Sequence, residues 1–206
     1  MKICILSLPR TSSSAMFETL SLLTGIKNAM SEPFNNSLWT EEQSNNFYDK
    51  IIKDDEILTK LMYRGLPHNI EEVEDFLIWI KNNFTHVICL YREDTLLQSE
   101  SFCYHSSKPR IKWYTPKLID LSNIDKEYIE KMKIHFYEDS LSLIKFANEN
   151  NFPLFKYEDL IINEGNNKSF EEICNYLNID FNYQKIKPYY RKELKVSYKA
   201  DSKKLL

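Results

Sequence analysis

The N-terminal segment combines an apolar strand, a hydroxyl-rich loop and a helix, and this unit constrains the fold more than any other part of the chain. Residues 2–8 (KICILSL) are typical of a buried strand, and residues 15–24 are typical of a helix that ends at Gly25. The first amides of a helix lack internal partners and lie at the positive end of its dipole. Loop 9–14 (PRTSSS) therefore predicts an anion site, to which Arg10 adds a full charge and a forked donor.

Further along the chain, predicted strands alternate with predicted helices. The predicted strands after the first cover residues 56–63, 85–91 and 152–157. Amphipathic patterns and capping boxes, the latter at Thr40 and Ser169, predict helices over residues 40–53, 71–82, 95–105, 125–150 and 169–177. We expect irregular structure over residues 26–39 and 106–121, and a basic, partly extended tail over residues 185–206. The alternation predicts an α/β fold, a three-layer sandwich with a mainly parallel central sheet, in one domain over residues 1–206.

Composition and charge narrow the classes of protein. The 206 residues carry a formal net charge of −3, which gives no reason to expect a nucleic acid or a membrane surface as a partner. Arg10 ends the first apolar run, so we predict a buried strand there rather than a signal peptide, and we expect a cytoplasmic protein. The four cysteines have no metal-like spacing and lie in apolar segments, so we expect them to be small core residues; they are Cys4, Cys89, Cys103 and Cys174. For the ligand predicted below, we expect that no metal is required.

Three predicted strands end in charged residues, and these ends should converge on one cleft because ligands of parallel sheets bind at the carboxyl ends of the strands. The three ends are residues 10–14, 92–94 and 156–159. A Walker A loop needs glycines and a lysine, and loop 9–14 has neither. The strand at 85–91 runs into Arg92 rather than into an acidic residue that would hold Mg²⁺. Two cationic strand ends predict a ligand with two separate phosphate groups.

Four segments resemble, in family order, motifs of sulfotransferases that use 3′-phosphoadenosine-5′-phosphosulfate (PAPS). Residues 8–14 (LPRTSSS) resemble the 5′-phosphosulfate loop, and residues 91–94 (YRED) with Gln98 and Ser101 resemble the 3′-phosphate motif. The other two segments resemble the E-P-F element of the carbohydrate branch and of the bacterial trehalose sulfotransferase, and the family's Y-E-D-L segment; they are residues 31–34 (SEPF) and 155–160 (FKYEDL). The resemblance spans about residues 1–175 and implies a P-loop NTPase-like fold.

The resemblance also implies a reaction. A sulfuryl group would pass from PAPS to a hydroxyl of a small acceptor, such as a carbohydrate or a related metabolite, and adenosine 3′,5′-bisphosphate would remain. Sulfuryl transfer is similar in its physics to phosphoryl transfer, in which the protein mainly positions groups and stabilises charge. Cationic side chains and loop amides could replace Mg²⁺, because the phosphosulfate carries less charge than a triphosphate.

The resemblance assigns donor-binding roles to two groups of residues. The 5′-phosphosulfate would contact Arg10, Thr11, Ser12, Ser13 and Ser14, where Ser12 stands at a position that is glycine in many members. The 3′-phosphate would contact Arg92, Ser101 or Ser99 and the tail residues Arg191 and Lys192, with Tyr157 supporting the cleft. The alternatives are a structural role for Arg10, ordinary serine capping at the loop, and a salt bridge from Arg92 to Glu93, Asp94 or Glu158.

The general base is predicted to be Glu32 of the E-P-F element, and the alternatives are His68 and His105. Lys60 is unexpected within a strand and could reach the sulfuryl oxygens, although an edge-strand lysine would look the same. Trp113 and Tyr114 are candidates for stacking on adenine or the acceptor. Two other functions remain open at this stage: a nucleotide or metabolite kinase with a degenerate P-loop, and a non-catalytic binding protein related to sulfotransferases.

Overall fold

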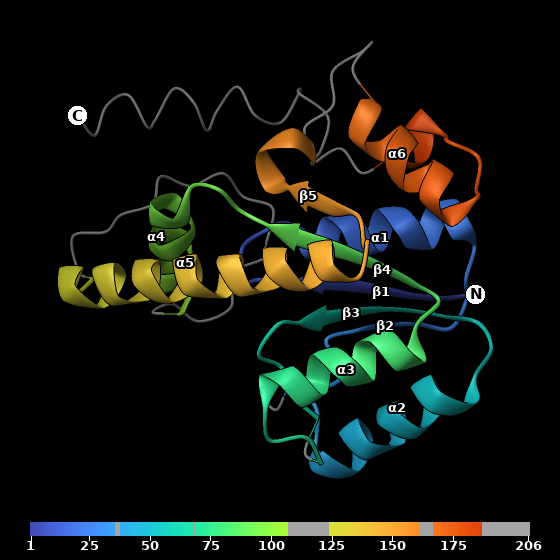
Figure 1. Cartoon of the computed structure of the whole chain (residues 1–206), viewed down its shortest axis with the longest axis horizontal. Coiled ribbons are helices and arrows are strands. Elements are labelled where there is room, and N and C mark those ends of the chain that lie inside the picture. The colour runs from blue at the N-terminus through green and yellow to red at the C-terminus, as the bar shows by residue number, and fades with distance from the viewer. Residues whose placement is uncertain (36–37, 68, 107–123, 161–166, 187–206) are drawn as a thin grey trace.

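A central parallel sheet organises the computed structural model, which describes residues 1–35, 38–67, 69–106, 124–160 and 167–186. Five strands lie in the order β2-β3-β1-β4-β5, all parallel (Figure 1). The strands are β1 (Lys2–Ser7), β2 (Ala29–Ser31), β3 (Ile57–Met62), β4 (His86–Tyr91) and β5 (Leu154–Lys156). The helices are α1 (Ser13–Thr24), α2 (Glu41–Lys53), α3 (Val73–Asn83), α4 (Thr95–Ser106), α5 (Lys126–Glu149) and α6 (Lys168–Leu177), with 3₁₀ turns η1 (Tyr157–Leu160) and η2 (Tyr183–Lys185).

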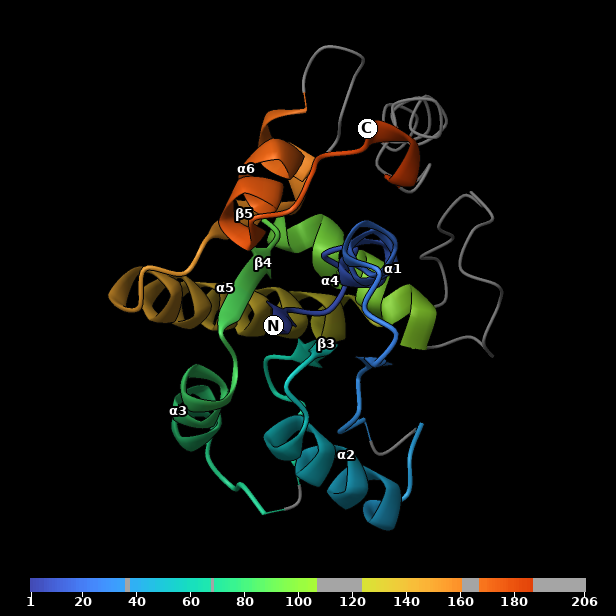
Figure 2. The same cartoon turned by 90° about the vertical axis from the view of Figure 1, so that its right-hand side faces the viewer.

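Helices cover both faces of the sheet, and each face has its own apolar core. Side chains alternate along a strand, so β1 sends Ile3 and Ile5 to one face and Cys4 and Leu6 to the other. The first core packs against α1 and α6, and the second packs against α2, α3 and α5. Figure 2 shows α1 and α3 on opposite sides of the strands. The expected α/β fold with a parallel central sheet is confirmed.

The connections of the chain diverge between β1 and β4, which are neighbours in the sheet. From β1 the chain passes through α1 to the β2 side, and from β4 it passes through α4 and α5 to the β5 side. Since α1 and α5 cover opposite faces, the loops after β1 and β4 separate at the carboxyl edge. In open parallel sheets a ligand crevice lies at such a switch point.

Most predicted elements are present within a few residues of their expected bounds. The capping box at Thr40 is confirmed, because its side chain accepts from the Gln43 amide while the Gln43 side chain accepts from the Thr40 amide. The prediction that Ser169 caps a helix is wrong: α6 begins at Lys168, and the Ser169 hydroxyl donates to the Asp159 carbonyl. The strand β2 lies within the segment expected to be irregular. Residues 107–123 and 187–206 lie outside the described residues.

All four cysteines are buried, as expected from the apolar segments in which they lie. Burial raises the pKa of the Cys89 thiol to about 12, which keeps this side chain protonated at neutral pH. Cys4 and Cys89 belong to the second core. These thiols therefore serve as small core side chains.

Candidate functional site

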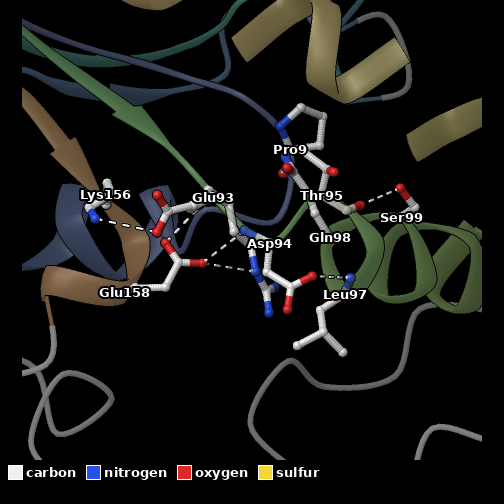
Figure 3. Close-up of polar contacts among 10 residues, drawn as sticks. Pro9, Glu93, Asp94, Thr95, Leu97, Gln98, Ser99, Lys156 and Glu158 are labelled. Carbon is white, nitrogen blue, oxygen red and sulfur yellow. Dashed lines mark hydrogen bonds and ion pairs between the residues drawn. The ribbon is translucent and has the colours of Figure 1, made fainter. Parts of the chain in front are cut away.

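The loop after β1 has an unusual backbone conformation. Hydrogen bonds within the loop and from α4 hold it in place. Arg10 has a φ of 63° and Ser12 a φ of 60°, both in the left-handed region that glycine adopts most easily. The buried Thr11 hydroxyl donates to the Leu8 carbonyl at 2.8 Å. From α4, the buried Gln98 side-chain amide donates to the Pro9 carbonyl at 2.6 Å (Figure 3). The Thr11 hydroxyl is thus used by the loop itself, so any contact of this residue with an anion falls to its backbone amide.

Arg10 connects the loop to α4. Its Nε donates to the Ser101 hydroxyl at 2.9 Å. Its charge also lies close to His105, whose pKa is lowered first by burial and then by the Arg10 charge. The sequence placed Ser101 with Arg92, whereas the structure gives it a hydrogen bond to Arg10. His105, an alternative base, is brought beside the same arginine.

A buried lysine joins the loop to the predicted base. Lys60 lies on β3, an interior strand between β2 and β1, and only 2% of its side chain is exposed. Its Nζ donates to the Ser14 hydroxyl at 2.8 Å and forms an ion pair with Glu32 Oε1. The edge-strand alternative for Lys60 is therefore wrong. Two residues that the sequence put forward for different reasons meet beside the first turn of α1.

Glu32 follows β2 and has both carboxylate oxygens engaged. Lys60 takes Oε1, and the Asn35 side-chain amide donates to Oε2 at 2.7 Å. The Glu32 amide donates to the Lys60 carbonyl at 2.8 Å, which fixes the backbone beside the same strand. Because 21% of the side chain remains exposed, this carboxylate lies between the core and solvent.

Backbone strain gathers at this site. Five non-glycine residues in the described part of the chain have a positive φ: Arg10, Ser12, Glu32, Asn151 and Asn178. Asparagine tolerates the left-handed region, whereas arginine, serine and glutamate enter it at a cost. Three of these five residues therefore belong to the candidate site: Arg10 and Ser12 of the loop, and Glu32, the predicted base. Such strain persists where surrounding contacts enforce it, and it is commonest at functional sites.

The second cationic strand end lies after β4. The Arg92 guanidinium stacks on the Tyr157 ring, with 4.7 Å between its Cζ and the ring centroid, and 15% of its side chain is exposed. Its Nε lies 3.7 Å from Glu158 Oε1 and, among the described residues, this buried atom has no hydrogen-bond partner. The alternative prediction for Arg92, a salt bridge to a nearby carboxylate, is thus confirmed with Glu158, at a distance near the upper limit for an ion pair.

Glu158 also covers the start of α4. Its carboxylate accepts from the Glu93 amide at 3.2 Å and from the Asp94 amide at 3.4 Å (Figure 3). Asp94 in turn accepts from the Leu97 amide at 2.9 Å. Lys156 at the end of β5 pairs with Glu93 at 3.3 Å. This corner of the sheet edge is therefore rich in carboxylates.

Two other predicted site residues, Ser99 and Ser13, are buried. The Ser99 hydroxyl donates to the Thr95 carbonyl within α4 at 2.6 Å and is buried, which favours Ser101, the partner of Arg10, over Ser99 as a polar residue of the candidate site. Ser13 is also buried in the first turn of α1. The other predicted residues lie outside the described residues; they are His68, Trp113, Tyr114, Arg191 and Lys192.

A third polar cluster, which the sequence did not predict, lies at the same edge of the sheet. Arg64, just after β3, makes a two-pronged ion pair with Asp139 of α5, with contacts of 2.6 to 3.0 Å, and His135 lies 3.5 Å from the same carboxylate. A neighbouring cavity of about 320 Å³ is lined by Tyr63, Arg64, Glu72, Val73, Glu74, Glu138, Asp139 and Ser142. The signal for Arg64 was its place directly after a strand, whereas nothing in a helical pattern marks Asp139.

The fold and these side chains define an α/β protein with a candidate anion site at the carboxyl edge of its parallel sheet. No protein-family model matches the chain, and no curated protein matches it significantly. In the described part of the chain, no group of three or more His, Cys, Asp or Glu side chains is arranged to hold a metal ion. None of the described helices has both the length and the apolar composition needed to cross a bilayer.

Proposed function

We propose that this protein is a PAPS-dependent sulfotransferase with a P-loop NTPase-like fold that transfers a sulfuryl group to a hydroxyl of a small acceptor. The observation that carries the proposal is the buried Lys60 ammonium, which links Ser14 of the candidate anion loop to Glu32, the candidate base. In a group transfer, a cation at that point would lie next to the donor, bound at the loop, and next to the acceptor hydroxyl, activated by Glu32. The motif resemblance and the switch point between β1 and β4 support the same assignment.

The donor half of the site would use the two cationic strand ends. Arg10 and the first amides of α1 would hold the 5′-phosphosulfate, since a helix N-terminus and a guanidinium both favour an anion. Arg92, whose guanidinium lies over the Tyr157 ring, would contact the 3′-phosphate through its N–H groups. The donor would thus lie across the loops after β1 and β4.

The transfer step would use Glu32 and Lys60. The Glu32 carboxylate takes the proton of the acceptor hydroxyl while that oxygen attacks sulfur, and the bond from sulfur to the 5′-phosphate oxygen breaks. Since Lys60 and Asn35 occupy both Glu32 oxygens, the ammonium must first move toward the sulfuryl oxygens. That movement would free a carboxylate oxygen and place positive charge where negative charge develops. Arg10 would offset the charge on the leaving phosphate.

The first experiment is calorimetric titration with adenosine 3′,5′-bisphosphate without metal, and in parallel with ATP plus Mg²⁺. A dissociation constant on the order of 1 μM for the bisphosphate, about −8 kcal/mol, with no binding of ATP is the expected result. Binding of ATP with Mg²⁺ alone would reject the proposal and favour a kinase. Binding of neither nucleotide would also reject it.

Turnover is tested with Glu32→Gln, which keeps the size of the side chain but removes its basicity. We expect bisphosphate binding to persist and sulfuryl transfer to fall by at least a hundredfold. Transfer at the normal rate would exclude Glu32 as the base and leave the two histidines as candidates.

A second candidate function is non-catalytic binding of the same nucleotide. One observation favours it: both oxygens of Glu32 are already engaged, so the site also fits a carboxylate with a purely structural task. Intact bisphosphate binding with no transfer to any acceptor, unchanged by Glu32→Gln, would support this candidate.

A further inference from the structure

We infer that Glu158 is an internal competitor for the anion at Arg92, so that a phosphate group can bind there only by displacing the Glu158 carboxylate. This inference rests on the proposed function for the identity of the nucleotide, and it concerns how that site is regulated. It makes Glu158 a residue that limits the affinity of the site.

The contacts of Glu158 are those that a bound phosphate would make. Its carboxylate accepts from two consecutive backbone amides at the start of α4, those of Glu93 and Asp94 (Figure 3). It also faces the Arg92 guanidinium, whose Nε lies 3.7 Å from Glu158 Oε1. Backbone amides at a helix start together with an arginine form the usual surroundings of a phosphate. The protein's own carboxylate thus occupies this position.

These contacts are long enough to be exchanged. The two amide distances are 3.2 and 3.4 Å, at or beyond the upper end of the normal range for N–H···O bonds. The Arg92 Nε lies 3.7 Å from Glu158, too far for a hydrogen bond, and 34% of the Glu158 side chain is exposed. A carboxylate with weak contacts and access to water can leave at small cost.

Arg92 does not depend on Glu158 for its position. Its guanidinium rests on the Tyr157 ring at 4.7 Å. Its buried Nε has no hydrogen-bond partner among the described residues, so it retains an unused donor directed at this corner. When Glu158 leaves, the stacked guanidinium can therefore stay in place and meet an incoming oxygen.

The charge of the corner explains why the exchange must occur. Among the described residues, the charged side chains of this corner are two cations and five carboxylates, a formal net charge of −3; they are Arg92, Lys156, Glu93, Asp94, Glu100, Glu158 and Asp159. A phosphate dianion arriving with Glu158 still in place would meet a carboxylate within a few ångströms. Like charges so placed oppose binding, and this opposition weakens at high salt.

The test compares Glu158→Gln with the wild type by calorimetry. Glutamine keeps an oxygen that can accept from the α4 amides but loses the charge. We expect Glu158→Gln to bind adenosine 3′,5′-bisphosphate about five- to tenfold more tightly, with adenosine 5′-monophosphate bound as before. The matched control is Asp159→Asn, which removes a neighbouring charge that pairs with Lys156 at 3.8 Å rather than with Arg92. That control should change neither affinity by more than about twofold.

Unchanged or weaker binding of the bisphosphate by Glu158→Gln would overturn the inference while leaving the proposed function intact. Equal tightening by Asp159→Asn would overturn it as well, because the effect would then come from net charge alone. Equal thermal unfolding midpoints of the wild type and the variants verify that the fold is retained.

A second readout separates this inference from the proposed function. Inorganic phosphate is titrated into each protein, and the NMR shifts of the Glu93 and Asp94 amides are followed. If no protein binds the bisphosphate, the proposed function fails, but a lower phosphate midpoint at these amides in Glu158→Gln would still support the exchange. Equal midpoints, or amides that do not respond, would overturn the inference in that case too.

Discussion

Two lysines on strands of the same sheet have opposite environments, and the comparison explains how the two ends of the candidate site differ. Lys60 lies on interior strand β3 with 2% of its side chain exposed, whereas Lys156 lies at the end of edge strand β5 with 32% exposed. Each pairs with a glutamate, Lys60 with Glu32 and Lys156 with Glu93. Strand position thus decides whether a Lys–Glu pair is part of the core or part of the surface.

The difference has a physical consequence for function. A pair in the interior is screened little by water, so leaving either partner without a counter-charge is costly. A pair at the surface is screened by water and salt and can be exchanged. Under the proposed function, the end of the site at β1 and β3 would hold the reacting groups, and the end at β4 and β5 would exchange one anion for another.

The largest expected effect comes from breaking the interior pair. Lys60→Met removes the ammonium and leaves Glu32 without its cation, so we expect a loss of about 2–4 kcal/mol in the free energy of unfolding, measured with urea. Lys156→Met, its matched control on the edge strand, should leave the urea midpoint unchanged. Similar losses in both variants would show that strand position does not separate the two pairs.

The next effect concerns ligand selectivity at the two arginines. We expect Arg92→Ala to lower the affinity for adenosine 3′,5′-bisphosphate by roughly ten- to a hundredfold. The affinity for adenosine 5′-monophosphate should change little, because this nucleotide lacks the phosphate assigned to Arg92. Arg10→Ala should weaken both nucleotides, which share the 5′-phosphate. Calorimetry with the two nucleotides measures the contrast, and an equal loss of both in Arg92→Ala would reject the assigned role.

A smaller effect is expected from the strained backbone of the loop. Ser12→Gly should stabilise the protein by up to about 1 kcal/mol, because glycine adopts a φ of 60° without steric cost. Ser13→Gly, one residue on and inside α1, should instead destabilise by about 0.5–1 kcal/mol, because there glycine only adds freedom to the unfolded chain. Opposite signs in urea unfolding support the strained loop, and the same sign in both would contradict it.

The smallest effect is electrostatic and concerns His105, whose pKa is lowered by burial and by the charge of Arg10. A lowered pKa means that the folded protein binds the proton less readily than the unfolded chain does. The stabilising contribution of neutral His105 is therefore fully present above the ordinary histidine pKa of the unfolded chain. It is lost as the pH falls from that value through the lowered pKa of the folded protein. Arg10→Ala should raise the pKa of His105, measured by NMR titration. An unchanged pKa would show that the two side chains do not lie close enough to interact.

The fold was largely predictable from local patterns, whereas the site was predictable only in part. Apolar runs predicted the strands β1 and β4, the mainly apolar segment 56–63 predicted β3, and the capping box predicted the start of α2, because these signals lie within a few neighbouring residues. The strand β2 was missed because its residues, 29–31 (AMS), form no apolar run. The strand β5 is equally short and also lies at an edge, but it was predicted because it lies within the mostly apolar segment 152–157 (FPLFKY).

The site residues were found where they follow a strand or sit in a motif, and their contacts were not. The sequence indicated Arg10, Glu32, Lys60 and Arg92, but it could not show that Lys60 pairs with Glu32 or that Arg10 contacts Ser101. The first pair is separated by 28 residues and the second by 91, and both depend on the order of strands in the sheet and on the packing of α4. Contacts over such separations have no local signature.

The hydrogen bond from Gln98 to the Pro9 carbonyl makes the loop and α4 a single unit of local unfolding. Thr11 holds the loop from within, and two side chains of α4 hold it from outside, Gln98 at the Pro9 carbonyl and Ser101 at the Arg10 guanidinium. Opening of α4 would release both, and the strained loop would then relax. Since a bound anion would stabilise the strained loop, it would also slow hydrogen exchange in the amides of α4 that the anion never touches.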